Sequence, residues 1–214
     1  MFKYIDKYIF GIYPGLAVLI ILMILFISGV CRAEERYIVG KGGIYSPSGG
    51  LADYDFEEGS AGEVAVGQEI TSAIAIEGGL GYIQTRAKYE VEDFMEEDRI
   101  TIIPVTLTLK MFVPISDKFK AYTGGGVGLY HAELESDFVV LGEKDTVNAS
   151  DDVLGVHAVM GVNYIINKRI WAGVEARHIW TEDAEAVLTP FGYPNDVNSD
   201  LNGWTMSAVF GVMF

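Results

Sequence analysis

From about residue 36 to its end, the chain alternates between apolar residues and polar or small ones at every second position. The last segment shows this pattern well, because from Trp204 to Phe214 one parity is apolar throughout while the other includes Thr205, Ser207 and Gly211. A period of two residues is typical of a β-strand that lies between an apolar and a polar environment. The same division recurs in one segment after another, so the sequence predicts an all-β protein.

Eight segments carry the alternating pattern, and the connections between them differ in length. The predicted strands cover residues 36–46, 61–70, 72–87, 100–113, 119–134, 153–165, 170–181 and 202–214. The short connections lie at residues 71, 114–118 and 166–169, and the long ones at 47–60, 88–99, 135–152 and 182–201. Short and long connections that alternate along the chain indicate an antiparallel meander with two unlike ends.

Strands of this length, each apolar on one face and polar or glycine-rich on the other, predict an eight-stranded antiparallel up-and-down transmembrane β-barrel of the outer membrane. Closure of the barrel pairs the backbone N–H and C=O groups within the lipid. A soluble eight-stranded barrel is the alternative, because it alternates in the same way with its apolar face turned inward around a ligand. Pro104 cannot donate a backbone hydrogen bond, and we expect a bulge there or membrane entry only after it.

Aromatic residues near the strand ends favour the membrane barrel over the soluble one. Tyr and Trp gather where a membrane protein crosses the two lipid–water interfaces. The residues expected in these two girdles are Tyr45, Tyr82, Tyr130, Trp180 and Trp204 beside the long connections, and Tyr122, Tyr164 and Phe214 beside the short ones. Tyr37, Phe112 and Trp171 have the opposite parity, and we expect them to point inward.

The N-terminal segment follows a different pattern. Two lysines precede an apolar run from Leu16 to Ile27, and small residues stand at the first and third positions of the triplet that ends at Ala33. This order predicts a signal peptide at residues 1–33 that is cleaved after Ala33. The barrel domain would then cover residues 34–214.

Two other interpretations of this segment remain open. The apolar run reaches the length of an uncleaved transmembrane helix if it extends back to Ile9 through Pro14 and Gly15. Alternatively, Cys31 becomes a lipidated first residue, although lipoprotein signals place Gly or Ala before that cysteine and Val30 stands here. Cleavage is favoured because a Ser-Gly pair interrupts the apolar run just before the predicted site.

The charge balance limits the partners of the chain. It has 30 Asp and Glu residues against 15 Lys and Arg, a formal net charge of −15, which excludes a generic nucleic-acid binder. Half of the residues are hydrophobic and 25 are Gly, so the chain is too apolar for a disordered acidic tail. The single Cys excludes a disulfide framework, and no Cys or His spacing matches a zinc site. We therefore expect no metal and no cofactor.

Acidic residues gather in the four predicted long connections. Beside anionic lipopolysaccharide they would repel unless divalent cations bridge the two, so we expect contact with outer-membrane lipid and lipopolysaccharide through such cations. A solvated acidic rim is the simpler alternative, because no connection contains a spaced calcium-loop motif. The acidic residues are Asp53, Asp55, Glu57 and Glu58; Glu90, Glu92, Asp93, Glu96, Glu97 and Asp98; Glu135, Asp137, Asp151 and Asp152; and Asp183, Glu185, Asp196 and Asp200.

Charged or titratable residues in the middle of strands lie on the inward parity. They are Lys41, Glu63, Glu77, Lys110, His157, Glu175 and Arg177. Side chains just fill an eight-stranded barrel, and unpaired ions inside it would be costly. We therefore expect a paired charge network in a filled lumen and no wide pore. A gate, or a narrow channel for small solutes or ions, is the alternative.

The C-terminus resembles the signature of bacterial outer-membrane proteins, since Phe214 is preceded by apolar residues at every second position, among them Val212 and Phe210. A similarity to the small porin-family barrels related to outer membrane proteins A, X and W lies in the stretches 37–45, 104–110 and 121–130. This resemblance implies the outer membrane of a Gram-negative bacterium, and it implies that the barrel-assembly machinery reads Phe210, Val212 and Phe214. It specifies architecture rather than activity.

A lipopolysaccharide-modifying barrel enzyme is the last alternative. Such relatives use a His with a Ser and an acid, and the resemblance makes His178 the candidate. Trp180 stands where the deacylase pattern has its Ser, so the nucleophile is missing. His131 and His178 have outward parity and His157 has inward parity, so the three cannot form one centre. We expect no catalytic residues and a structural or surface-interaction role through long acidic extracellular loops.

Overall fold

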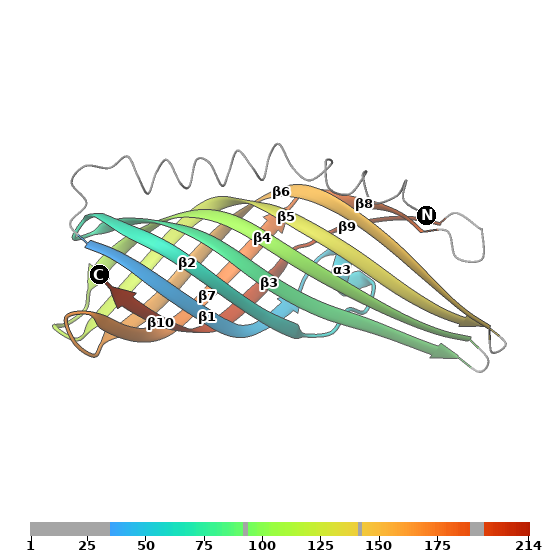
Figure 1. Ribbon diagram of the computed structural model, residues 1–214, viewed down its shortest axis with the longest axis horizontal. Coiled ribbons are helices and arrows are strands. Elements are labelled where there is room, and N and C mark those ends of the chain that lie inside the picture. Colours follow the sequence, from blue (N-terminus) through green and yellow to red (C-terminus); the bar gives the residue numbers. More distant parts are fainter. Residues whose placement is uncertain (1–34, 92–93, 141–142, 189–194) are drawn as a thin grey trace, which may run out of the picture.

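Eight strands of the chain close into an antiparallel barrel. The computed structural model describes residues 35–91, 94–140, 143–188 and 195–214, and within them the barrel has the strand order β1-β10-β7-β6-β5-β4-β3-β2 (Figure 1). Its strands are β1 (Glu35–Pro47), β2 (Gly59–Thr71), β3 (Ile74–Val91), β4 (Phe94–Pro114), β5 (Phe119–Val140), β6 (Glu143–Ile165), β7 (Ile170–Thr181) and β10 (Gly203–Met213). The predicted fold class is confirmed.

The first and last strands of the barrel pair with each other over all of β10 and all but the first two residues of β1. Tyr37 lies opposite Met213 at one end of this pairing and Pro47 lies opposite Gly203 at the other, while β1 pairs on its other side with β2. Neither strand keeps a free edge, so the wall can lie in lipid without leaving its backbone donors and acceptors unpaired.

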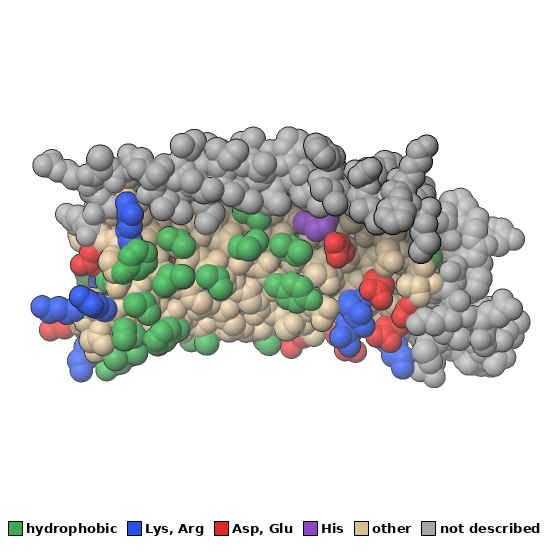
Figure 2. All heavy atoms as spheres, in the orientation of Figure 1, with side chains coloured by type: hydrophobic (Ala, Val, Ile, Leu, Met, Phe, Trp, Pro, Cys, Tyr) green, Lys and Arg blue, Asp and Glu red, His purple; other side chains and the backbone are tan. Residues whose placement is uncertain are grey.

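Apolar side chains cover the outside of the wall and polar ones point inward, as the alternation predicts. Leu107 is 40% exposed, whereas Thr108 next to it is 1% exposed. Figure 2 shows hydrophobic side chains over the middle of the barrel and charged ones toward its ends. On β4 the outward positions are apolar from Ile103 to Val113, a length that matches the 9–11 residues with which a tilted strand crosses a bilayer. This arrangement contradicts the soluble alternative, in which the apolar face would point inward.

The two ends of the barrel differ (Figure 1). Short turns at residues 72–73, 115–118 and 166–169 join the strands at one end. We take this end as periplasmic, because small outer-membrane barrels have short periplasmic turns and longer extracellular connections. At the extracellular end, the strands from β3 to β6 continue past the ends of the neighbouring strands as two long hairpins. We call the extracellular part of these four strands, residues 83–91, 94–102, 131–140 and 143–152, the extracellular sheet.

The prediction of long loops at residues 88–99 and 135–152 was therefore wrong. β3 pairs with β4 as far as Val91 and Phe94, and β5 pairs with β6 as far as its last described residue. Polar and charged residues stand at both parities in these stretches, because both faces of the sheet lie outside the lipid. Without an apolar parity, the alternation gives no signal from which to recognise a strand.

The other two long connections also contain secondary structure. A short helix, α3 (Gly50–Asp53), lies between β1 and β2, and β8 (Asp183–Leu188) pairs with β9 (Asn195–Asp200) between β7 and β10. No helix in the described residues is long and apolar enough to cross a membrane. The predicted signal peptide at residues 1–33 lies outside the described residues, so cleavage after Ala33 stays a prediction.

Pro104 lies inside β4 without the expected bulge. The register between β3 and β4 is unchanged across this residue, although the pairing is interrupted at Gly81 and Tyr82. A Cβ atom on Gly81 would lie 2.8 Å from Pro104 Cγ, so the proline ring uses space that the glycine leaves free. The missing N–H is accommodated by a local gap in the pairing rather than by an extra residue.

Three tyrosines predicted for the interfacial girdles point into the barrel instead. Tyr45, Tyr122 and Tyr130 are almost completely buried, whereas Trp180 and Trp204 are exposed as expected. The prediction was wrong because it gave more weight to the position of each tyrosine near a strand end than to the parity of that position. Each of the three tyrosines has the inward parity of its strand, and a closed barrel obeys parity along its whole length.

Glycines on the inner face provide the room for the inward aromatic rings. Tyr122 lies directly opposite Gly161 on the neighbouring strand, and Trp171 lies opposite Gly211. A methyl group on either glycine would overlap the ring that lies over it. The glycine-rich parity of the sequence is therefore a consequence of packing large rings inside a narrow barrel.

The last strand offers a test of the assembly signal. Phe214 is exposed, its N–H donates to the Arg36 carbonyl oxygen at 2.8 Å, and Phe210 lies on the same outward face. We expect Phe214→Asp to lower the amount of folded barrel in outer-membrane fractions several-fold, measured by heat-modifiable gel mobility. Ile115→Asp, in an exposed periplasmic turn, is the matched control. Equal amounts of folded Phe214→Asp and control protein would refute the role assigned to this residue.

Candidate functional site

The described side chains inside the barrel form three layers between its two ends. Apolar residues around Leu51 fill the extracellular layer, ionised side chains fill the middle layer, and a cavity with aromatic walls occupies the periplasmic layer. We call these layers the apolar plug, the charge layer and the vestibule. β1 runs through all three, because Tyr45 belongs to the plug, Lys41 to the charge layer, and Tyr37 to the vestibule wall.

The charge layer consists of three cations and three carboxylates from five strands. They are Lys41 from β1, Glu63 from β2, Glu77 from β3, Lys110 from β4, and Glu175 and Arg177 from β7. Their side chains are only 2–8% exposed. Equal numbers of opposite charges make the layer neutral, which is the condition under which ionised groups are tolerated away from water.

Each lysine of the charge layer contacts at least two carboxylates. Lys41 Nζ lies 2.6 Å from Glu63 Oε1 and 2.6 Å from Glu77 Oε1. It also lies 3.1 Å from Glu175 Oε1. Lys110 Nζ lies 2.9 Å from Glu77 Oε2 and 2.9 Å from Glu175 Oε2. The two lysines therefore hold Glu77 and Glu175 between them, although the four residues come from four different strands.

Arg177 binds Glu63 with the paired geometry of a guanidinium and a carboxylate. Nη1 donates to Glu63 Oε2 at 2.5 Å, and Nη2 donates to Glu63 Oε1 at 3.0 Å. Nη2 also donates to Glu175 Oε1 at 3.3 Å. Two parallel charge-assisted hydrogen bonds fix both the distance and the orientation of the pair. The arginine thus ties β2 to β7 across the lumen.

Two tyrosine hydroxyls complete the charge layer, and the sequence analysis did not foresee them. Tyr37 donates to Glu77 Oε2 at 3.2 Å, and Tyr122 donates to Glu175 Oε2 at 2.9 Å. Lys110 Nζ lies 4.7 Å from the centre of the Tyr122 ring, within range of a cation–π contact. Their inward parity is the signal that could have identified both tyrosines as partners of the charges.

The structure brings six of the seven residues expected in the lumen charge network into direct ion pairs. His157, the seventh, also points into the lumen but lies outside the ion pairs. Its Nε2 atom lies 2.8 Å from Thr108 Oγ1, so its described partner is a hydroxyl group. Spacing and parity placed the histidine inside the barrel correctly, but they could not show that Thr108 lies nearer to it than a carboxylate.

The apolar plug is a hydrophobic cluster that closes the extracellular half of the lumen. Leu51 of α3 reaches into it and is 1% exposed. Tyr45 holds the plug in place, because its hydroxyl donates to the carbonyl oxygens of Leu201 and Asn202 at 2.9 and 3.0 Å. The buried members of the plug are Tyr45, Leu51, Ile83, Ile100, Ile102, Tyr130, Ala132, Val153, Ile179 and Leu201.

The histidines occupy separate environments. His131 Nδ1 lies 2.9 Å from Asp152 Oδ1 on the outer surface. His157 lies in the lumen, where its partner is the hydroxyl group of Thr108. His178 packs against two rings on the outside of the barrel, with centroid distances of 4.2 Å to Trp180 and 4.5 Å to Trp204. Among the described residues, no group of three or more His, Cys, Asp or Glu side chains is placed to hold a metal ion.

A closed eight-stranded barrel with an apolar outer band and a polar, filled lumen is the architecture of a small bacterial outer-membrane protein. The chain belongs to the outer membrane protein beta-barrel domain family, whose model matches residues 18–214. Its location is therefore the outer membrane of a Gram-negative bacterium, and the porin-family resemblance is confirmed.

Three solved structures share the fold of this chain. OprG from Pseudomonas aeruginosa is 14% identical with a TM-score of 0.59, over 86% of this chain and 97% of that protein. A major outer membrane protein from Thermus thermophilus is 12% identical with a TM-score of 0.58, over 86% and 100%. Neisserial surface protein A is 13% identical with a TM-score of 0.53, over 84% and 97%. No curated protein matches in sequence. At these identities the likeness shows the fold alone.

Proposed function

We propose that this protein is a plugged outer-membrane barrel that acts through its extracellular surface rather than as a channel. The observation that carries the proposal is the neutral charge layer beneath the apolar plug. A solute that enters from outside would have to displace Leu51 and then separate charges that lie 2.6–3.1 Å apart. Breaking a buried pair costs about 3–5 kcal/mol, which keeps this path closed. The proposed role is not enzymatic, and the separate environments of the three histidines support this view.

Planar-bilayer recording of the refolded protein tests whether the lumen is closed. We expect no current steps above background for the natural sequence. A variant that lacks α3 and carries Glu63→Ala and Arg177→Ala should conduct, because it loses Leu51 from the plug together with one balanced ion pair. This variant also shows that the assay detects an open lumen. Discrete steps from the natural sequence would favour the narrow channel for small solutes or ions instead.

The outer face of the extracellular sheet offers a place for lipopolysaccharide. Arg86 and Arg99 lie directly opposite each other on β3 and β4. Arg99 lies 3.9 Å from Glu135 and 4.0 Å from Glu97, distances longer than a hydrogen bond, so its guanidinium group can still donate to an anion shared with Arg86. Nearby on the same sheet, Glu133 and Asp152 both lie beside His131. We propose that phosphate groups of lipopolysaccharide bind the two arginines directly and bind the carboxylates through divalent cations.

Removal of divalent cations tests this contact. We expect lipopolysaccharide to bind the refolded barrel in magnesium and to bind several-fold more weakly in EDTA, measured by a shift in gel mobility or by calorimetry. The double variant Glu133→Gln and Asp152→Asn should lose most of the dependence on magnesium. Asp117→Asn, in an exposed turn at the periplasmic end, should keep it. If EDTA left lipopolysaccharide binding unchanged in every variant, the result would favour the alternative of an acidic rim that contacts only solvent.

A further inference from the structure

The vestibule is a cavity of about 290 Å³ at the periplasmic end of the lumen. Its walls are aromatic, because Tyr37 packs edge-on against Trp171 with ring centroids 5.1 Å apart, and Phe112 packs against Tyr122 at 5.6 Å. Side chains of the charge layer form its floor. A ligand could therefore enter from the periplasm and would stop at the charge layer. This cavity has no role in the extracellular function proposed above.

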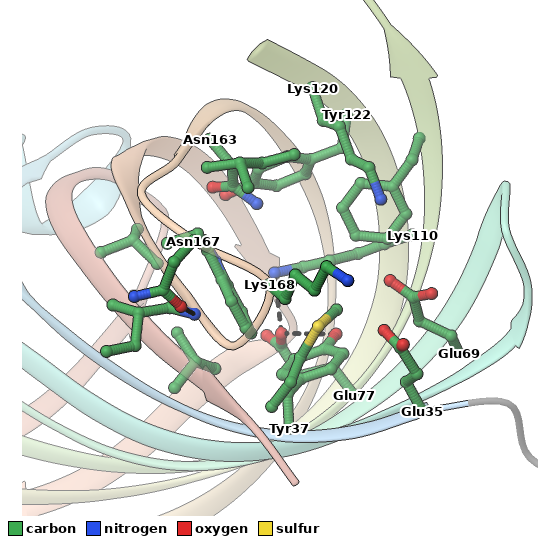
Figure 3. A pocket seen from close by; sticks show the side chains of 17 residues that line it. Glu35, Tyr37, Glu69, Glu77, Lys110, Lys120, Tyr122, Asn163, Asn167 and Lys168 are labelled. Carbon is green, nitrogen blue, oxygen red and sulfur yellow. Dashed lines mark hydrogen bonds and ion pairs between the residues drawn. The ribbon is translucent and has the colours of Figure 1, made fainter. Parts of the chain in front are cut away.

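Charges of both signs border the vestibule. Glu35 and Glu69 lie directly opposite each other on β1 and β2, and Figure 3 shows their carboxylates next to each other. Lys120 on β5 and Lys168, in the turn between β6 and β7, also line the cavity. Two carboxylates and two ammonium groups around one small cavity suit a zwitterion better than a simple anion or cation.

Asn163 gives the vestibule an unused hydrogen-bond acceptor. This residue is 9% exposed and lines the cavity, and its Oδ1 atom has no hydrogen-bond partner among the described residues. Buried acceptors are normally paired, and an unpaired one destabilises the free protein. A ligand N–H group at this position would provide the missing partner.

From these features we propose that the vestibule binds a short zwitterionic peptide with an aromatic or large apolar side chain. The side chain packs against the aromatic walls, the ammonium group faces the two glutamates, and the carboxylate faces the two lysines. The peptide N–H donates to Asn163 Oδ1, which distinguishes a peptide from a free amino acid. The cavity volume lies at the lower end of the range for small-molecule sites, so one dipeptide fills it.

Alanyl-phenylalanine is the probe for this site. In the refolded protein with Trp180→Phe and Trp204→Phe, Trp171 is the only tryptophan left, and it stands in the vestibule wall. We expect the dipeptide to change Trp171 emission in a saturable way. Acetylation of its N-terminus, or amidation of its C-terminus, should each weaken binding about tenfold, because each removes a charge-assisted contact. No saturable change, or equal binding of the capped peptides, would overturn the proposal.

Variants at the mouth and wall of the vestibule complete the test. Lys168→Gln, in an exposed turn, should weaken binding of the dipeptide about tenfold. Lys118→Gln makes the same change of charge in a turn that does not line the cavity, and it should have no effect. Asn163→Leu should weaken the dipeptide and leave the weaker binding of free phenylalanine unchanged. Equal effects of both lysine variants, or free phenylalanine bound as tightly as the dipeptide, would overturn the assignment.

Discussion

Arg177→Ala should lower the free energy of unfolding of the barrel by about 3–5 kcal/mol, because the substitution leaves the buried charge layer with one more carboxylate than it has cations. Arg177 makes two parallel hydrogen bonds to Glu63 and a third contact with Glu175, and its side chain is 5% exposed. After the substitution, the charge layer would hold two cations and three carboxylates. Urea unfolding of the refolded protein in lipid, followed by tryptophan fluorescence, measures the loss.

A double variant separates charge imbalance from lost packing. Arg177→Ala combined with Glu63→Ala leaves two cations and two carboxylates in the layer, so part of the lost stability should return, by about 1–3 kcal/mol. Arg169→Ala removes a positive charge from an exposed periplasmic turn and should change stability by less than about 0.5 kcal/mol. The free energies of unfolding of the double variant and of Arg169→Ala are the references with which the loss in Arg177→Ala is compared.

The same variants distinguish a plugged barrel from a gated one. If the charge layer were a gate, Arg177→Ala would leave stability nearly unchanged and would raise single-channel conductance sharply. In a plugged barrel it costs stability and opens at most a narrow path, because Lys41 and Lys110 still hold Glu77 and Glu175. A stable and strongly conducting variant would therefore rule out the plugged barrel and support the channel.

The fold could be predicted from the sequence where each strand separates lipid from lumen. Outward apolar residues such as Leu107 and inward charged residues such as Lys110 alternate on β4, and this contrast fixes both the strand and its orientation. The outer parts of the extracellular sheet, residues 88–99 and 135–152, could not be predicted in this way, because both faces lie outside the lipid and polar or charged residues stand at both parities there. The apolar plug was missed for a related reason, since a four-residue helix that carries Leu51 has no periodic pattern.

The members of the charge layer could be predicted from parity, but their partners could not. Parity places Glu175 and Arg177 in the lumen, yet the contact between Arg177 and Glu63 depends on the shear of the closed barrel, which brings β2 and β7 to face each other. Tyr122 was assigned to the interface because tyrosine is common there. Its hydroxyl instead satisfies a buried carboxylate, and Gly161 makes room for its ring.

Leu107→Arg should lower the free energy of unfolding in lipid by about 2–4 kcal/mol, because this side chain lies on the lipid-facing surface near the middle of the apolar band. Leu107 is 40% exposed and lies opposite Val127, which is 51% exposed, on the next strand. An arginine here would place its charge in hydrocarbon, with only apolar neighbours on this face. Val156→Arg, on the same face of β6, should have a similar effect.

Thr101→Arg is the matched control, because Thr101 lies on the same face of β4 but beyond the apolar band, opposite Glu133. Arginine near the interface costs only about 0–1 kcal/mol, so the control should unfold almost like the natural sequence. A single tryptophan at position 107, with the natural tryptophans replaced by phenylalanine, should be quenched strongly by lipids brominated near the bilayer centre. One at position 101 should be quenched weakly. Equal quenching at both positions, or equal stability of the two arginine variants, would contradict the placement of this band in the membrane.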